Sequence, residues 1–145
     1  MKKYITKLSA LASALLFSGN LMALEVGDKV PAFEALDDHG KSWKSESFRG
    51  KKLLLIYFYP AAMTGGCTKQ ACAFRDDQAK WKERNVEVVG VSGDDPQNLA
   101  LFKQAERLNF SLLADPDGKV AKAFGVPAGK GGSIDRFVKG EKFTL

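Results

Sequence analysis

The chain has little sulfur and almost no imidazole. Its 145 residues include two cysteines, Cys67 and Cys72, and one histidine, His39, which lies in a polar segment. These side chains are too few for a four-ligand zinc site. The cysteines lie five positions apart, which excludes the Cys-x-x-Cys motif of thioredoxin-type redox proteins. The sequence therefore raises the question of why both sulfurs lie in one short segment.

The apolar run near the N-terminus is too short to span a bilayer. It reads LSALASALLF, follows three lysines, and leads through small residues to Ala23. This order is typical of a secretory signal. We therefore expect a signal at residues 1–23, an exported and periplasmic protein, and one domain over residues 24–145.

A strong basic charge is absent once this signal is set aside. The formal net charge falls from +5 to +2, because the signal holds three lysines and no acidic residue. The remaining lysines and arginines do not gather with aromatic residues, as they do on a nucleic-acid-binding face. We expect no nucleic-acid partner, and no membrane association after signal removal.

Predicted strands and helices alternate along the rest of the chain. Asp38–Gly40 is typical of a hairpin tip between two short strands. The run Leu53–Tyr59 predicts a strand buried on both faces, which Pro60 ends because proline cannot donate to a central ladder. Further strands are expected from Val86 and over FSLLADP, with a short helix over Gly118–Phe124 and a weak hairpin over RFVKGEKF. This order is typical of an α/β domain with a mostly parallel sheet.

Both cysteines belong to a predicted helix from about Gly66 to Arg84. One stripe, apolar except for a glutamine, recurs there at spacings of three and four: Cys67, Ala71, Phe74, Gln78 and Trp81. The stripe places Cys67 in the first turn and makes its aromatic members core residues.

A second helix is expected to begin with Asp95 as N-cap and Pro96 in the first turn. Its outer face is expected to carry Glu106. Its inner face is expected to hold Leu99, Phe102, Ala105 and Leu108.

The loop before Cys67 lies at the carboxyl end of a predicted parallel strand, where open α/β sheets bind ligands. The free N–H groups and the dipole of the helix start favour a thiolate at Cys67. Gly65 and Gly66 are expected to allow a tight turn and to leave room for a small ligand beside the sulfur. The Thr64 hydroxyl can donate to an oxygen bound there, and can also cap the helix.

The spacing of the cysteines bears on whether they form a bridge. Five helical residues advance about 7.5 Å along the axis, more than the roughly 7 Å that a disulfide allows between Cα atoms. Cys67 and Cys72 can therefore pair only if the first turns of the helix unwind. The alternative is a static disulfide, which is common in exported proteins.

The segment YFYPAAMTGGCTKQACAFRD closely resembles the peroxide site of peroxiredoxins, whose motif is Pro-x-x-x-Thr/Ser-x-x-Cys. Pro60, Thr64 and Cys67 occupy the motif positions, and Cys72 matches the resolving cysteine of the Q-type subgroup. A looser resemblance extends from about Gly27 to about Val126.

The resemblance implies a thioredoxin-like α/β fold and the reduction of hydrogen peroxide or organic hydroperoxides. Cys67 would attack the peroxide and become a sulfenic acid, Cys72 would condense with it to a disulfide, and a thioredoxin-like protein would reduce that disulfide. No metal, haem or flavin cofactor is implied. We expect a monomer or a weak homodimer.

The family also places a catalytic arginine in a later Arg-x-Thr-Phe segment, which this chain does not clearly contain. Arg136 has poorly matching neighbours, and Arg75 lies about 12 Å along the helix from Cys67. We therefore expect that the family's last hairpin and helix are missing. Two other functions remain open, a thiol–disulfide oxidoreductase and a non-enzymatic, copper-binding thioredoxin-fold module.

Overall fold

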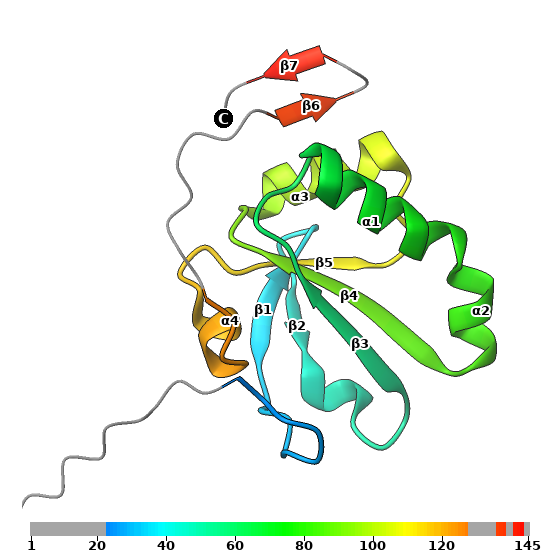
Figure 1. Ribbon diagram of the computed structural model, residues 1–145, viewed down its shortest axis with the longest axis vertical. Coiled ribbons are helices and arrows are strands. Elements are labelled where there is room, and N and C mark those ends of the chain that lie inside the picture. Colours follow the sequence, from blue (N-terminus) through cyan, green and yellow to red (C-terminus); the bar gives the residue numbers. More distant parts are fainter. Residues whose placement is uncertain (1–22, 128–135, 139–140, 144–145) are drawn as a thin grey trace, which may run out of the picture.

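The computed structural model describes residues 23–127, 136–138 and 141–143 (Figure 1). The expected signal therefore lies outside the described residues, apart from Ala23. The strands are β1 (Glu34–Asp37), β2 (Ser42–Lys44), β3 (Leu53–Phe58), β4 (Val86–Ser92), β5 (Ser111–Ala114), β6 (Arg136–Val138) and β7 (Glu141–Phe143). The helices are the 3-10 helix η1 (Ser45–Phe48) and the α-helices α1 (Gly65–Asp76), α2 (Gln78–Glu83), α3 (Pro96–Glu106) and α4 (Lys119–Ala123).

Five strands form one mixed sheet in the order β2-β1-β5-β4-β3. β3, β4 and β5 run parallel, and β1 is antiparallel to both β5 and β2. The carboxyl ends of the parallel strands therefore meet at one edge of the sheet. The predicted α/β class is confirmed, and this sheet with its flanking helices is a thioredoxin-like fold.

Helices cover both faces of the sheet, with α1 and α3 on one face and α4 on the other (Figure 1). The pleat of the strands divides the core accordingly, because neighbouring residues point to opposite faces. Val88 and Leu112 join the α1 and α3 side, whereas Val89 and Leu113 join the α4 side. The α1 and α3 side also holds both buried tyrosines and Cys67.

The prediction that β3 is buried on both faces is only partly right. β3 is one of the two edge strands of the five-stranded sheet, and its first residue, Leu53, is 67% exposed. The strand is covered further along, where Tyr57 is buried. A continuous apolar run therefore marked a parallel strand correctly, but it could not show the strand's position in the sheet.

The predicted helix from Gly66 to Arg84 is two helices. α1 ends at Asp76 and α2 begins at Gln78, because the backbone of Asp77 leaves helical geometry with φ −88° and ψ 9°. The predicted stripe still faces the core, since Phe74 and Trp81 pack against the buried cluster that contains Cys67. No helix within the described residues is long and apolar enough to cross a membrane.

The start of α3 agrees with the sequence. Asp95 is the N-cap and accepts a hydrogen bond from Asn98 N at 2.8 Å, with Pro96 in the first turn. Leu99 and Phe102 are buried as predicted, and Ala105 is half-buried. Leu108 is also buried, but it follows the end of α3. Both predicted hairpins also form, β1–β2 around Asp38–Gly40 and β6–β7 near the end of the chain.

Candidate active site

Cys67 lies where the edge of the sheet meets a helix start. β3 ends at Phe58, and the ladder continues one step further because Tyr59 N donates to Val91 O at 3.1 Å. Pro60 then ends the pairing. Cys67 is the third residue of α1 and is 8% exposed. The predicted place of this sulfur, in the first helical turn at the carboxyl edge of the sheet, is confirmed.

A buried carboxylate from the next strand loop supports the segment before Cys67. Asp94 follows β4, is 5% exposed, and accepts hydrogen bonds from Ala62 N at 2.7 Å and from Ser92 Oγ at 2.9 Å. Sequence reasoning missed this residue. The sequence held a signal for it, because Asp94 lies two residues after a buried parallel strand. That strand pairs with β3, so the Asp94 side chain lies at the same edge of the sheet as the loop before Cys67.

The tight turn of this loop is made by Met63 and not by the glycines. Met63 is fully buried and has φ +63°, a left-handed conformation that costs roughly 1–2 kcal/mol for a side chain with a Cβ. Gly65 and Gly66 lie within α1, and neither has a positive φ. The prediction that these glycines make the turn is therefore wrong. A Cβ built on either glycine meets nothing within 4 Å, which agrees with open space beside the helix start.

Thr64 stands at the N-cap position of α1, but its hydroxyl does not cap the helix. Thr64 Oγ1 donates to Ala61 O at 3.1 Å, and no side-chain cap bond forms. The backbone carbonyl of Thr64 accepts the first helical bond, from Thr68 N at 2.9 Å. The expected side-chain cap is therefore absent, and the hydroxyl instead holds the loop in its turn.

Aromatic rings close the core side of Cys67. Tyr57 stacks on Tyr59 with ring centroids 5.4 Å apart, and it packs against Phe74 at 4.7 Å. The Tyr57 hydroxyl is buried and has no hydrogen-bond partner among the described residues. Burial, and then the proximity of both cysteines, raises the pKa of Tyr57, so the phenol stays neutral.

Cys72 lies in a different environment, at the contact between α1 and α3. Its sulfur is 3.6 Å from Glu106 Oε2, and Arg75 Nη1 donates to Glu106 O at 2.5 Å. The prediction that Glu106 points outward is therefore wrong, because its side chain contacts Cys72. Burial raises the pKa of the Cys72 thiol, the Glu106 carboxylate raises it further, and Arg75 opposes the shift.

Both cysteines are free, and α1 is continuous from Gly65 to Asp76. The structure therefore contains no static bridge between Cys67 and Cys72, as the helical spacing predicted. Arg75 is placed toward Cys72 and Glu106, and the side chain of Arg136, the first residue of β6, lies outside the described residues.

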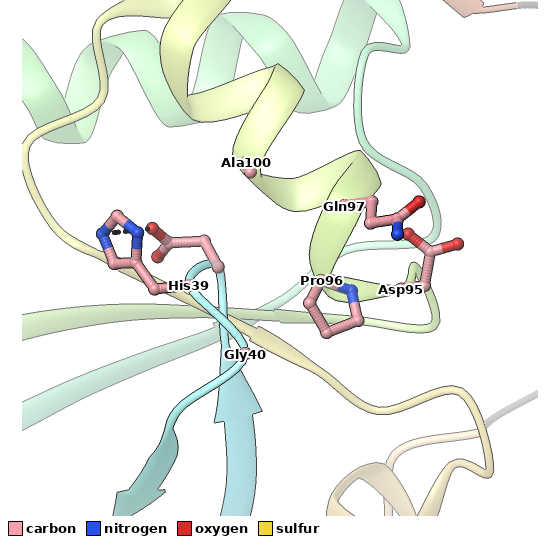
Figure 2. Close-up of a pocket in the computed structure, with 7 residues that line it drawn as sticks. His39, Gly40, Asp95, Pro96, Gln97 and Ala100 are labelled. Carbon is pink, nitrogen blue, oxygen red and sulfur yellow. Dashed lines mark ion pairs between the residues drawn. The ribbon is translucent and has the colours of Figure 1, made fainter.

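A shallow depression lies elsewhere, between the β1–β2 hairpin tip and the start of α3 (Figure 2). Its lining residues are Asp38, His39, Gly40, Asp95, Pro96, Gln97 and Ala100. Asp38 is buried there and ties the hairpin to the core, because it pairs with Lys103 Nζ at 2.9 Å and accepts from Leu112 N at 3.0 Å. None of the predicted site residues borders this depression. Within the described part of the chain, no three His, Cys, Asp or Glu side chains gather as a metal site requires.

Comparison with known proteins assigns the chain to a family. The model of the AhpC/TSA family matches residues 26–139. The chain belongs to the AhpC/TSA family.

Its relatives are peroxiredoxins. A chloroplastic peroxiredoxin Q of Populus jackii is 43% identical over 129 residues, covering 89% of this chain and 60% of the relative. A protein named putative peroxiredoxin bcp from Haemophilus influenzae is 48% identical over 103 residues, covering 71% of this chain and 66% of the relative. The chain thus spans less than two thirds of either relative.

Solved structures show the same fold. The crystal structure of peroxidoxin BcpB from Mycobacterium tuberculosis superposes with a TM-score of 0.66 at 35% identity, covering 81% of this chain and 71% of that one. The strand, loop and helix that carry Cys67 therefore belong to a peroxiredoxin fold.

Proposed function

We propose that this chain is a thiol-dependent peroxidase that reduces hydrogen peroxide or organic hydroperoxides. The observation that carries the proposal is the arrangement of Pro60, Thr64 and Cys67 at the carboxyl edge of the sheet, with a second free cysteine on the same helix. In the first step, the Cys67 thiolate attacks one peroxide oxygen. A sulfur–oxygen bond forms, the oxygen–oxygen bond breaks, and the other oxygen takes a proton and leaves as water or an alcohol.

The site has separate parts for this step. The helix start stabilises negative charge on the sulfur. Ionisation alone is not enough, because an ordinary cysteine is already about 3% thiolate at neutral pH, so complete ionisation raises the nucleophile population at most ~30-fold. The remaining acceleration requires donors that hold the peroxide and stabilise the leaving oxygen. The amides of the first turn are the donors in place, and Pro60 shapes the loop that presents them. The Thr64 hydroxyl joins them when it turns from Ala61 O to the bound peroxide.

In the second step, the Cys72 sulfur attacks the sulfenic sulfur of Cys67. The disulfide forms, the sulfur–oxygen bond breaks, and hydroxide leaves as water with the proton of the Cys72 thiol. A thioredoxin-like dithiol then reduces the disulfide and is itself oxidised. The two cysteines together thus supply the two electrons that the peroxide receives.

Two single-cysteine variants test this proposal. Cys67→Ser should abolish peroxide consumption with a thioredoxin-type reductant, because it removes the nucleophile. Cys72→Ser should still consume one equivalent of peroxide and keep an added oxygen on Cys67, detectable by mass and trappable with a dione reagent. The assignment is reversed if Cys67→Ser retains appreciable turnover while Cys72→Ser loses it. If both variants match the wild-type protein, the chain is not a peroxidase of this kind.

A further inference from the structure

The second half of α1 is tied by three polar contacts to the C-terminal end of α3 and to the loop that follows it. The Cys72 sulfur lies 3.6 Å from Glu106 Oε2. Arg75 Nη1 donates to Glu106 O at 2.5 Å, and Asn109 Nδ2 donates to Arg75 O at 3.3 Å. None of these contacts involves Cys67. They hold the Cys72 side of α1 in place, and the Cys72 sulfur must leave this position if the two sulfurs are to meet.

Helix geometry keeps the sulfurs apart while these contacts hold. At about 100° per residue, five residues place Cys72 about 140° around the helix axis from Cys67. Cys67 faces the buried cluster with Tyr57, whereas Cys72 faces Glu106. The Cys72 sulfur cannot reach Cys67 without leaving Glu106.

We propose that Glu106 is a positioning residue for Cys72, whose carboxylate holds the thiol on the α3 side of α1, so that opening of this contact limits disulfide formation. The inference rests on the proposed function, since it assigns a residue to the second step of that reaction. Glu106 does not touch the peroxide, and it leaves the first step at Cys67 unaffected.

The charges around Cys72 support this role. The groups that face it are Arg75 and Asp76 on α1, Glu106 on α3, and the neutral Tyr57 on β3. Burial and the two carboxylates raise the pKa of the Cys72 thiol, and Arg75 lowers it. In the closed contact Cys72 is therefore a hydrogen-bond donor and a poor nucleophile, so it does not compete with Cys67 for peroxide.

The step that Glu106 controls is the condensation of the Cys72 thiol with the Cys67 sulfenic acid. The sulfur–sulfur bond forms as the sulfur–oxygen bond breaks, and the Cys72 proton leaves within the water. Two changes must precede this: the thiol leaves Glu106, and it loses its proton. Removing the Glu106 charge makes both easier.

The decisive variant is Glu106→Gln, which keeps the side-chain length and the backbone carbonyl that Arg75 binds. Reduced full-length protein is mixed with one equivalent of hydrogen peroxide, and sulfenic acid and disulfide are followed by rapid quenching and mass. We expect an unchanged first step and a second step that is about three- to tenfold faster, because glutamine replaces a charged acceptor by a neutral one and only part of the hydrogen bond is lost. Glu83→Gln, an exposed site on α2, removes the same charge and should change neither step.

A pH series separates positioning from simple loosening of the fold. In Glu106→Gln the midpoint of the pH dependence of the disulfide-forming rate should move to lower pH, because the carboxylate no longer favours the protonated thiol of Cys72. In Arg75→Met the midpoint should move to higher pH, because the opposing cation is lost. A purely structural loss of packing would accelerate opening in both variants and leave both midpoints in place, and that result would overturn the proposal. A slower or unchanged second step in Glu106→Gln would overturn it too.

Thiol alkylation tests the same contact without any peroxidase activity. In a Cys67→Ser background Cys72 is the remaining thiol, and its rate of reaction with iodoacetamide is measured against pH. Glu106→Gln should react faster and with a lower midpoint, and Arg75→Met with a higher one. If the wild-type protein forms no sulfenic acid, the proposed function fails, and this measurement still decides the role of Glu106. Equal midpoints in all three proteins would refute that role.

Discussion

Cys67 and Cys72 lie on the same helix, in surroundings of opposite kind. Cys67 and loop residues 61–63 are buried, and this segment is held from several directions by Asp94, the Thr64 hydroxyl and two stacked tyrosines. Cys72 is half-buried, and its segment is held by Glu106, the last residue of α3, through the side chain and the backbone carbonyl of that residue.

The difference follows from what each sulfur has to do. A nucleophile that meets a small substrate gains from a fixed arrangement, because every donor is already in place when the substrate binds. A sulfur that must travel to its partner needs contacts that are few and near the surface, since each one has to break. One helix serves both purposes because Cys67 lies on its core-facing stripe, whereas Cys72 lies on the side that meets α3.

The largest expected effect is a change in amide exchange when the disulfide forms. One equivalent of hydrogen peroxide should remove two hydrogens by mass and speed exchange over residues 64–75 by about two orders of magnitude, as expected when roughly 3 kcal/mol of local protection is lost. Reduction should restore the protection. Residues 86–92 of β4 serve as the internal control and should not change, because the sheet is not required to move.

A disulfide that forms without faster exchange over residues 64–75 would contradict this prediction. The comparison between the two cysteines would then lose its basis, since α1 would not need to open. In Cys72→Ser the added oxygen should persist on Cys67 while the helix stays protected.

The second-largest effect is expected at Asp94, which supports the loop before Cys67. Asp94→Asn replaces a charged acceptor by a weaker one, so the bond to Ala62 N should loosen and the loop before Cys67 should be less well placed. Hydrogen bonds to charged groups contribute about 1.5–3 kcal/mol, and the amide recovers part of that, so we expect the peroxide step to slow about tenfold. Single-turnover formation of the sulfenic acid measures it.

The neighbouring acid provides a matched control. Asp95→Asn makes the same chemical change at an exposed N-cap, where asparagine is as good as aspartate, so neither the rate nor the stability should change. Asp94→Asn should leave the disulfide-forming step unchanged. Equal effects of both variants on the peroxide step would mean that Asp94 does not support the loop.

The sequence predicted the features that depend on local chemistry. Pro60 ended a strand, Asp95 and Pro96 began a helix, and the spacing of apolar residues placed Cys67 at a helix start facing the core. These features arise from a few neighbouring residues, so they can be read along the chain.

The features that sequence reasoning missed depend on contacts between distant segments. Asp94 reaches Ala62 across 32 positions, and Glu106 reaches Cys72 across 34, and no periodicity connects them. Glu106 is the last residue of a helix, a position where a charged side chain is expected to be exposed, so the sequence did not indicate its contact with Cys72. Met63 adopts a positive φ that its residue type disfavours, because the surrounding loop holds it there.

The smallest expected effect tests whether the Tyr57 side chain only packs against Cys67 or also takes part in the reaction. Tyr57→Phe removes a buried hydroxyl that has no partner among the described residues and keeps the ring that stacks on Tyr59. An unsatisfied buried hydroxyl is costly, so the free energy of unfolding at neutral pH should stay the same or rise by up to about 1 kcal/mol. The advantage of the variant should widen above about pH 10, because the phenol of the unfolded wild-type protein ionises there. Burial raises the pKa of Tyr57 in the native protein and keeps it neutral, so the wild-type protein loses stability as the pH rises.

Denaturant unfolding at neutral pH and above about pH 10 measures the stability, and single-turnover sulfenic acid formation measures the reaction. We expect an unchanged peroxide step; a slower one would show that the Tyr57 hydroxyl acts on the sulfur or the peroxide, and the rings around Cys67 would then belong to the reacting site.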